Sequence, residues 1–322
     1  MSKFSHTPVL LNEALVALDL GGERANGWYV DATFGRGGHS AAILSQLGPR
    51  ARLFAFDRDP AAIASGRERF GGDARLTLLH AAFGSLRQTI KETLDAQAAE
   101  WSGVFYGVLF DFGVSSPQLD DATRGFSFMK DGPLDMRMDN SSGLTAAQWL
   151  ADAPEREIAR VLREHGEERF SNRIARALVE QRRATPFTTT HELANAVSAA
   201  VPTREPGKHP ATRTFQSLRI VVNDELQQID RALEQSLDLL APDGRLCAIS
   251  FHSLEDRRVK QFMQRQSQED PVYAGLPDVP PHAQPKLKRI GRAIHASDAE
   301  VSANPRSRSA ILRVAAKIGV AA

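Results

Sequence analysis

The sequence has little of several features that would define other classes of protein. It contains one cysteine, Cys247, which excludes an internal disulfide and a cysteine-rich zinc site. No apolar run approaches the ~18 residues that a membrane-spanning helix needs, and the first residues lack the apolar stretch of a signal peptide. We therefore expect a soluble cytoplasmic protein without a membrane partner, and no cluster of ligand side chains predicts a metal.

Charge of one sign is also scarce, because the formal net charge is only +1. The distribution is less even, since residues 286–317 contain eight basic residues and only two acidic ones, Asp298 and Glu300. Such a cluster suits a polyanion, because each neutralised phosphate releases counterions. A solvated basic tail would have the same composition. Charge alone leaves both interpretations open.

Hydrophobic patterns predict strands at 28–31, 52–56, 76–79 and 104–110, alternating with helices. This order is typical of an α/β fold with a parallel sheet covered by helices. A first helix is expected from Thr7 and Pro8, and one long helix from Leu218 to Leu240, followed by strands at 246–251 and 310–316. Residues 118–213 contain helical patterns only, including a capping box at 189–192. We predict a discontinuous core, 1–117 with 214–322, and an inserted helical substrate-recognition domain, 118–213.

The candidate cofactor site begins at the glycine-rich turn between Asp31 and His39, which follows a strand and precedes a helix. Asp57 and Asp111 end two other strands, at the edge where open α/β sheets bind ligands. NAD-binding folds share a glycine turn and a downstream acid. Here position 40 is Ser instead of the third glycine, and Asp31 would repel a pyrophosphate but attract a sulfonium. These residues favour S-adenosylmethionine over NAD.

The segment that begins at Asp111 supplies the candidate catalytic groups, namely Asp111, Ser115, Ser116 and Pro117, which Gln118 follows. Their acceptors could hold an exocyclic amine in line with a methyl group, although an ordinary Ser-Ser-Pro turn would look the same. Methylation at pyrimidine C5 normally needs a cysteine thiolate. Cys247 lies in an apolar run and is expected to be a core residue. We therefore favour a nitrogen or oxygen target.

Three further residues are candidates for contacts with a nucleic acid. Arg213 and Phe215 could pair with and stack on a flipped base, while Phe215 could equally be a core residue. His252 follows the fifth expected strand, at the edge of the sheet that should carry the site. A lone histidine is more often structural than catalytic, but this position keeps His252 a candidate.

The chain resembles the bacterial 16S rRNA cytosine-N4 methyltransferases, the ribosomal RNA small subunit methyltransferase H family, formerly MraW. The resemblance covers essentially the whole chain in order. It departs from the family at Ala32, where Gly is frequent, and at Phe112, where Leu is usual. The blocks that carry it are 6–13, 31–39, 57–60, 111–121, 124–129, 132–139, 166–170, 209–216, 250–257 and 304–308.

This resemblance implies a class I S-adenosylmethionine-dependent methyltransferase with a Rossmann-like core. It implies methylation of the N4 amine of a decoding-centre cytosine, position 1402 in the P-site region of 16S rRNA, in the small ribosomal subunit or a late assembly intermediate. Arg306 and Arg308 are added as candidate RNA contacts. Other classes to test are an NAD-dependent oxidoreductase, a non-catalytic RNA-binding factor, and an enzyme acting on DNA or adenine. The cofactor contacts that the resemblance implies are Gly37, Gly38, His39, Asp57, Phe83, Asp111 and Gln118.

Overall fold

The computed structural model describes residues 8–97, 104–203, 205–273 and 279–319. The chain divides into two compact units. One is formed by the residues up to Gly113 together with those from Gln227 onward, and the other by Val114–Leu226. The predicted boundaries lie at 117/118 and 213/214, so the second boundary falls 13 residues later in the structure than in the prediction, because α10 (Thr212–Asn223) packs on α7 (Glu155–Gly166) inside the second unit.

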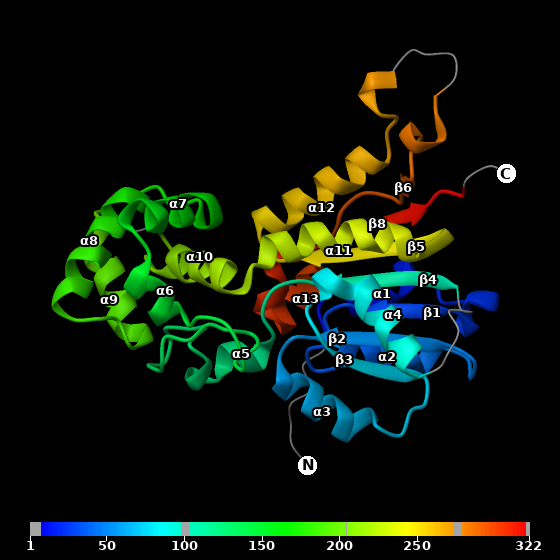
Figure 1. The fold of residues 1–322 in the computed structure, drawn as a ribbon, viewed down its shortest axis with the longest axis horizontal. Coiled ribbons are helices and arrows are strands. Elements are labelled where there is room, and N and C mark those ends of the chain that lie inside the picture. The colour runs from blue at the N-terminus through cyan, green and yellow to red at the C-terminus, as the bar shows by residue number, and fades with distance from the viewer. Residues whose placement is uncertain (1–7, 98–103, 204, 274–278, 320–322) are drawn as a thin grey trace. The chain divides into compact units, whose positions relative to one another are not determined.

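A mixed sheet forms the centre of the first unit (Figure 1), which confirms the predicted α/β core. Its strands follow the order β3-β2-β1-β4-β5-β8-β6, with β7 paired to β8. The first five strands in this order are parallel, and β8 runs antiparallel to its neighbours β5, β6 and β7. The bounds are β1 Trp28–Asp31, β2 Arg52–Asp57, β3 Leu76–His80, β4 Phe105–Asp111, β5 Leu240–Ser250, β6 Leu287–Arg289, β7 Ile294–His295 and β8 Ile311–Lys317.

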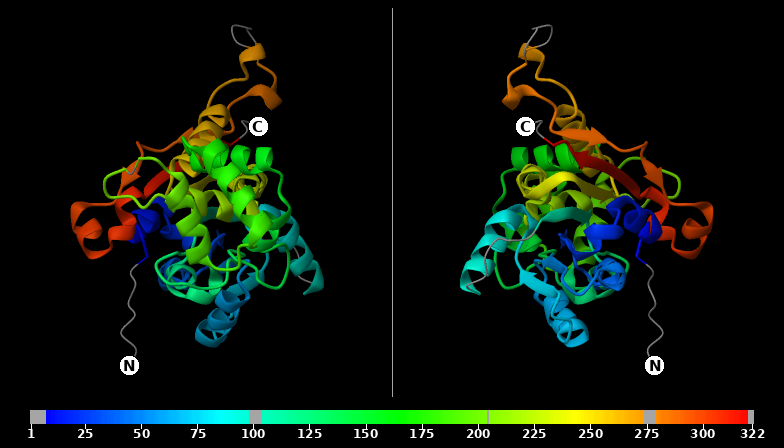
Figure 2. Two further views of the ribbon diagram at one scale, coloured as in Figure 1. Left: turned by 90° about the vertical axis from the view of Figure 1, so that its left-hand side faces the viewer. Right: turned by 90° about the vertical axis from the view of Figure 1, so that its right-hand side faces the viewer.

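Helices cover both faces of this sheet (Figures 1 and 2). Helices α1 and α2 contact each other and pack on the central strands. Helix α11 is hydrogen-bonded to α4 and to the turn before it, and ion pairs join it to α12 (Asp230–Arg258 and Glu234–Arg265). Asp59 caps α3 through the amide of Ala61, as its Asp-Pro sequence predicts. The bounds are α1 Leu11–Leu18, α2 Gly38–Gln46, α3 Pro60–Phe70, α4 Leu86–Ala96, α11 Glu225–Leu239, α12 Ser253–Gln266 and α13 Asp298–Ala303.

The start of the first helix differs from the prediction. Thr7, the expected cap, lies outside the described residues, and Pro8 precedes the helix instead of opening it. The helix begins at Leu11, after Leu10 in a left-handed conformation with φ of 52°. Pro8 instead packs close to Gly38, where an added Cβ would lie 2.3 Å from the proline ring.

The second unit is helical, and within its described residues the one β pairing is the isolated bridge between Pro133 and Thr189. The capping box predicted at Thr189 and Glu192 is present. Buried apolar side chains from five of its helices and from the loop at 126–138 form its core. The bounds are α5 Ser116–Asp120, α6 Ala146–Asp152, α7 Glu155–Gly166, α8 Ser171–Ala184, α9 Thr190–Ala200 and α10 Thr212–Asn223.

The single long helix predicted after residue 218 is wrong. Asp224 has a left-handed φ of 52° and separates α10 from α11. Asp adopts this conformation more readily than most residues. The preceding Asn223 is buried, and its side-chain amide bonds the carbonyl of Met136 and the amide of Met138. The helix therefore ends at Asn223, whose side chain holds the loop at Met136 and Met138. The spacing of apolar residues contains no signal for such an end.

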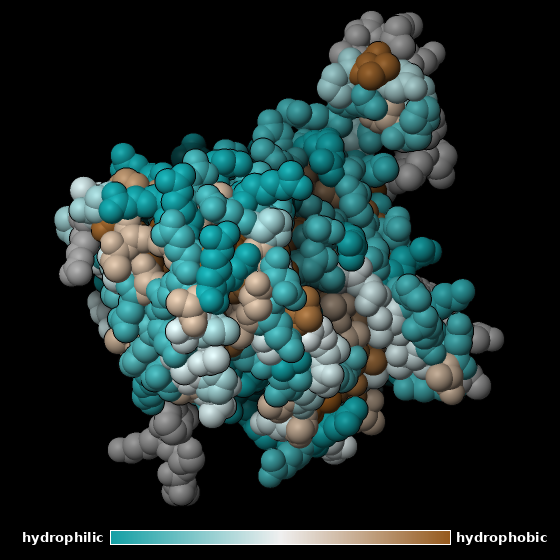
Figure 3. Space-filling model, turned by 60° about the vertical axis from the view of Figure 1, so that its left-hand side comes forward, coloured by the Kyte–Doolittle hydropathy of each residue, from teal (hydrophilic) through white to brown (hydrophobic). Residues whose placement is uncertain are grey.

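Among the described helices, none is both long and apolar enough to cross a lipid bilayer. On the face drawn in Figure 3, hydrophilic residues predominate and apolar ones occur in scattered groups.

Candidate active site

Three carboxylates gather at one edge of the sheet. Asp31, Asp57 and Asp111 end β1, β2 and β4, which are adjacent parallel strands in the order β2-β1-β4. The carboxyl ends of parallel strands meet at the same edge, where open α/β sheets bind ligands. The structure thus brings together the three acids that the sequence analysis placed at strand ends.

The turn between β1 and α2 is held tightly against this edge. Gly35 and Gly37 have positive φ values of 53° and 71°, a conformation that favours glycine. The amide of Gly35 donates to Oδ2 of Asp57 at 2.7 Å. An added Cβ on Gly37 would lie 2.6 Å from the ring of Phe34 and 2.7 Å from that of Phe70. The turn therefore needs glycine for both conformation and space, and it presents backbone at the edge.

Asp57 is half-buried, and backbone amides bond both of its oxygens. Besides the amide of Gly35, that of Asp59 donates to Oδ1 at 2.8 Å. Burial raises the pKa of Asp57 to about 6, and the two amides partly offset this. Each carboxylate oxygen can accept a second hydrogen bond, so Asp57 can also bind a hydroxyl pair of a ligand.

Asp31 is buried at the start of the glycine turn. Its side chain is 1% exposed, and it accepts hydrogen bonds from the amide of Thr33 and from the hydroxyl of Ser40 at 2.6 Å. Burial raises its pKa. The acid therefore stabilises the glycine turn through Thr33 and Ser40, and an attraction of its charge to a sulfonium stays a prediction. Ser40 stands where the dinucleotide fingerprint has its third glycine, and its hydroxyl donates a hydrogen bond to Asp31.

His39 links the turn to Asp111. Its ring is buried, with Nε2 3.2 Å from the carbonyl of Val9 and Nδ1 3.6 Å from Oδ2 of Asp111. Because a carbonyl only accepts, Nε2 carries a proton and Nδ1 faces the carboxylate. The Nδ1–Oδ2 separation of 3.6 Å places the imidazole beside the carboxylate without a hydrogen bond between them. His39 thus lies between the carbonyl of Val9 and the carboxylate of Asp111.

Asp111 carries a buried carboxylate oxygen without a hydrogen-bond partner among the described residues. Burial raises its pKa to about 6, while the imidazole of His39 lowers it and the carboxylates of Asp31 and Glu255 raise it. Its backbone amide donates to Thr33 Oγ1 at 2.7 Å, which fixes the end of β4. Its Oδ1 has no hydrogen-bond partner among the described residues, although the side chain is 25% exposed. A hydrogen-bond donor of a ligand would supply the partner that this oxygen lacks.

Aromatic rings lie beside Asp111. Phe83, which follows β3, contacts Phe110 and Phe112 at centroid distances of 5.9 and 5.8 Å. Phe110 and Phe112 are buried, whereas Phe83 is half-buried. Phe112, where the family usually has Leu, therefore extends this aromatic group, and the exposed part of Phe83 offers a surface for a flat ring.

The residues after β4 open helix α5 in the second unit. Ser115 is its cap, Ser116 and Pro117 form its first turn, and Gln118 accepts a hydrogen bond from the amide of Ser115 at 2.9 Å. Gln118 is buried, so this capping box accounts for its amide oxygen. A cofactor contact of Gln118 and catalytic roles for the other three stay predictions.

The candidate RNA contacts have different local environments. Phe215 is 4% exposed and packs on Phe128, so it is a core residue and the stacking alternative is wrong. Arg213 is paired with Glu205 at 2.8 Å. His252 caps α12, with its Nε2 3.0 Å from Glu255. Arg306 and Arg308 are exposed in the 3-10 turn Pro305–Ser309.

Cys247 is fully buried in β5, as expected of a core residue. Burial raises the pKa of its thiol to about 12, so it is not a thiolate at neutral pH. Within the basic segment, Arg313 and Lys317 are engaged with Asp256 and the carbonyl of Leu237. The remaining basic side chains of that segment are exposed.

Strand order, the glycine turn after β1 and the acids that end β2 and β4 are those of a Rossmann-like α/β fold, and the family match below identifies its class as a methyltransferase. A model of the MraW methylase family matches residues 3–318, so the chain belongs to that family. S-adenosylmethionine is the methyl donor that membership in a methylase family implies.

Solved structures give weaker likenesses. A candidate rRNA methylase from Clostridium thermocellum is 13% identical, covers 97% of this chain and 98% of its own, and has a TM-score of 0.44. A candidate methyltransferase from Streptococcus mutans in complex with SAH is 12% identical over 99% and 100%, with a TM-score of 0.39. An rRNA methylase from Streptococcus thermophilus is 12% identical over 98% and 100%, also at 0.39.

Proposed function

We propose that this protein transfers a methyl group from S-adenosylmethionine to the exocyclic N4 amine of the decoding-centre cytosine of 16S rRNA. The observation that carries the proposal is the family match over residues 3–318. The unpartnered, buried Oδ1 of Asp111 at the carboxyl edge of the sheet supports it, because an amine donor suits that oxygen.

The residues at the sheet edge fit the cofactor. Asp57 retains acceptor capacity for the two ribose hydroxyls, and the exposed part of Phe83 can pack on the adenine ring. Gly37 and Gly38 leave no room for side chains, because Phe34, Phe70 and Pro8 occupy the places where a Cβ would lie. His39 lies 3.6 Å from Asp111. When bound, S-adenosylmethionine supplies an activated methyl group.

The protein's own contribution is to position the amine and to accept its proton. The nitrogen lone pair of cytosine N4 is delocalised into the ring, so the amine must be aligned and lose one proton on methylation. Asp111 Oδ1 accepts an N–H of the amine, and the raised pKa of about 6 makes this carboxylate a better proton acceptor than an ordinary Asp. Ser115 and Ser116 add hydroxyl acceptors in the following turn.

The buried thiol favours nitrogen over ring carbon as the target. Carbon methylation needs a nucleophilic thiolate at the base, and the only cysteine is fully buried with a raised pKa. The exposed basic residues of 286–308, including Arg306 and Arg308, suit the phosphates of 16S rRNA. We place the reaction in the cytoplasm, on the small ribosomal subunit or a late assembly intermediate.

A methyl-transfer assay tests this function. Labelled S-adenosylmethionine is offered with unmethylated small subunits, naked 16S rRNA and DNA, and the products are digested to nucleosides. We expect label in N4-methylcytidine from subunits or rRNA, and its loss in Asp111→Asn with cofactor affinity, measured by calorimetry, retained within about tenfold. Label in another nucleoside, or in DNA alone, would refute the proposed target. Cofactor and RNA binding without transfer would indicate a non-catalytic RNA-binding factor.

A further inference from the structure

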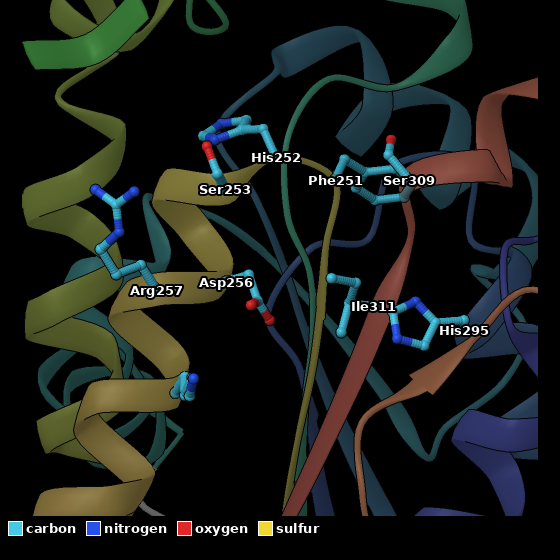
Figure 4. Close-up of a pocket in the computed structure, with 9 residues that line it drawn as sticks. Phe251, His252, Ser253, Asp256, Arg257, His295, Ser309 and Ile311 are labelled. Carbon is cyan, nitrogen blue, oxygen red and sulfur yellow. The ribbon is translucent and has the colours of Figure 1, made fainter. Parts of the chain in front are cut away.

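A cavity in the first unit is not used by the proposed reaction. Its volume is about 530 Å³, and it is lined by residues from the end of β5, from α12, from β7 and from the start of β8. Figure 4 shows these side chains around the space between α12 and β8. Two of the sequence blocks noted above, 250–257 and 304–308, lie at its walls or immediately before them.

The lining combines an apolar surface with hydrogen-bonding groups. Phe251 and Ile311, both half-buried, supply the apolar part. The hydroxyls of Ser253 and Ser309 and the imidazole of His295 are exposed at its walls. An aromatic face beside hydroxyl and imidazole groups is the chemistry that recognises an unstacked nucleotide, because it can pack on a base and bond the polar edges and the 2′-hydroxyl.

The charge of the cavity is positive. Its one acidic lining residue in the described chain, Asp256, is neutralised by Arg313, whose Nε and Nη2 donate at 2.6 and 2.9 Å. Lys260, one turn further along α12, is exposed and has no ion-pair partner in the parts of the chain that the structure describes. Arg257 also lines the cavity, but its guanidinium points away from Asp256 in Figure 4. Lys260 therefore supplies a cation that a phosphate can pair with.

The cavity lies at the same edge of the sheet as Asp111. Asp111 is in register with Ile249 of the neighbouring parallel strand β5, and Phe251 follows two residues later. Ile311 of β8 pairs with Ser250 on the far side of β5. Two strand spacings amount to about 10 Å, so the cavity is displaced sideways from the acid that we assign to the amine.

A buried carboxylate ties the mouth of the cavity to the loop after Asp111. Glu255 is fully buried, and its Oε2 accepts from the amides of Phe251 and His252 at 2.7 and 3.3 Å. A Cβ added to Gly113 would lie 3.8 Å from its Oε1. Glu255 therefore holds the backbone at Phe251 and His252, and the backbone after β4 passes close to the same side chain.

We propose that this cavity binds a nucleotide of the substrate RNA that neighbours the methylated cytosine, with its base against Phe251 and Ile311 and a phosphate at Lys260. The proposal rests on the proposed function. It adds a contact that would hold the RNA strand in place while the target amine lies at Asp111. The displacement along the sheet edge suits an adjacent nucleotide and not the target base itself.

The test compares Lys260→Glu and Ser309→Trp with Lys91→Glu. The first reverses the cation and the second fills the mouth, while Lys91 is an exposed lysine on α4, outside the cavity. Binding of a decoding-region RNA oligonucleotide is measured by anisotropy over a salt series, and S-adenosylmethionine binding by calorimetry. We expect at least tenfold weaker RNA binding for both cavity variants, unchanged cofactor affinity, and wild-type behaviour for Lys91→Glu. Lys260→Ala should lower the salt slope by about 1.

A second measurement does not depend on folding of the variants. The oligonucleotide carries 4-thiouridine next to the target cytosine, and we expect its photo-crosslink to the wild-type protein to map to 251–260 or 309–311. Wild-type RNA affinity in both cavity variants, or crosslinks elsewhere only, would overturn the proposal. Neither readout requires turnover. Crosslinks at the cavity without methyl transfer would therefore refute only the proposed function. Methyl transfer with normal RNA binding by both cavity variants would refute only the proposed nucleotide site.

Discussion

Replacing Asp111 by Asn should stabilise the protein while it abolishes methyl transfer. Asn has the same shape but no charge, and burial raises the pKa of Asp111 to about 6, compared with about 3.9 for an ordinary Asp. Each tenfold change in proton affinity corresponds to about 1.4 kcal/mol. The ionised carboxylate therefore reduces the free energy of unfolding at pH 7 by about 3 kcal/mol, which Asn would restore.

The sign of the pH dependence follows from the same difference. Between about pH 4 and pH 6 the folded chain binds more protons at Asp111 than the unfolded chain does, so this group's contribution to stability falls as the pH rises. The penalty is full above about pH 6 and shrinks to roughly half at pH 5. The gain from Asp111→Asn should shrink with it as the pH is lowered.

Thermal and urea unfolding of both proteins at pH 7.5, 6 and 5 measure this effect. We expect a midpoint several degrees above wild type at pH 7.5 and a much smaller difference at pH 5. Asp73→Asn is the matched control, because Arg75 lowers the pKa of Asp73 and the substitution should therefore destabilise slightly, with the opposite dependence on pH. An Asp111→Asn variant that is less stable than wild type at pH 7.5, or a gain that does not vary with pH, would refute the reasoning.

Three other substitutions test the site. Asp57→Ala should raise the Kd for S-adenosylmethionine about 10- to 100-fold, because the ribose loses charged acceptors worth about 1.5–3 kcal/mol; unchanged affinity by calorimetry would contradict this role. Cys247→Ala should leave kcat within about twofold, whereas a thiolate mechanism demands a loss of several orders of magnitude. Gly37→Ala should lower the unfolding midpoint and weaken the cofactor, since φ of 71° and the rings of Phe34 and Phe70 oppose a Cβ; an unaltered midpoint would show that the turn tolerates a side chain.

The sequence by itself predicted the parallel sheet and the residues at its functional edge. Alternating apolar segments located β1 to β4 within a residue or two, and each of Asp31, Asp57 and Asp111 ends its strand in the structure. This succeeds because buried parallel strands are short continuous apolar runs, and because side chains directly after them must lie at one edge. The burial of Cys247 and the capping box at Thr189 follow from equally local patterns.

Only the tertiary structure decided which side chains are open to a ligand. Asp31 and Asp111 both end strands, but Ser40 and Thr33 bond the first, whereas Oδ1 of the second keeps no partner among the described residues. The burial of Phe215, whose apolar ring suits a core as well as a base, was also decided only by the tertiary structure, as was the helix break at Asp224. A sequence pattern shows which positions along the chain are polar. Burial and hydrogen-bond partners depend on residues that are distant in sequence. Burial and these partners set the pKa of each group and decide whether a ligand can reach it.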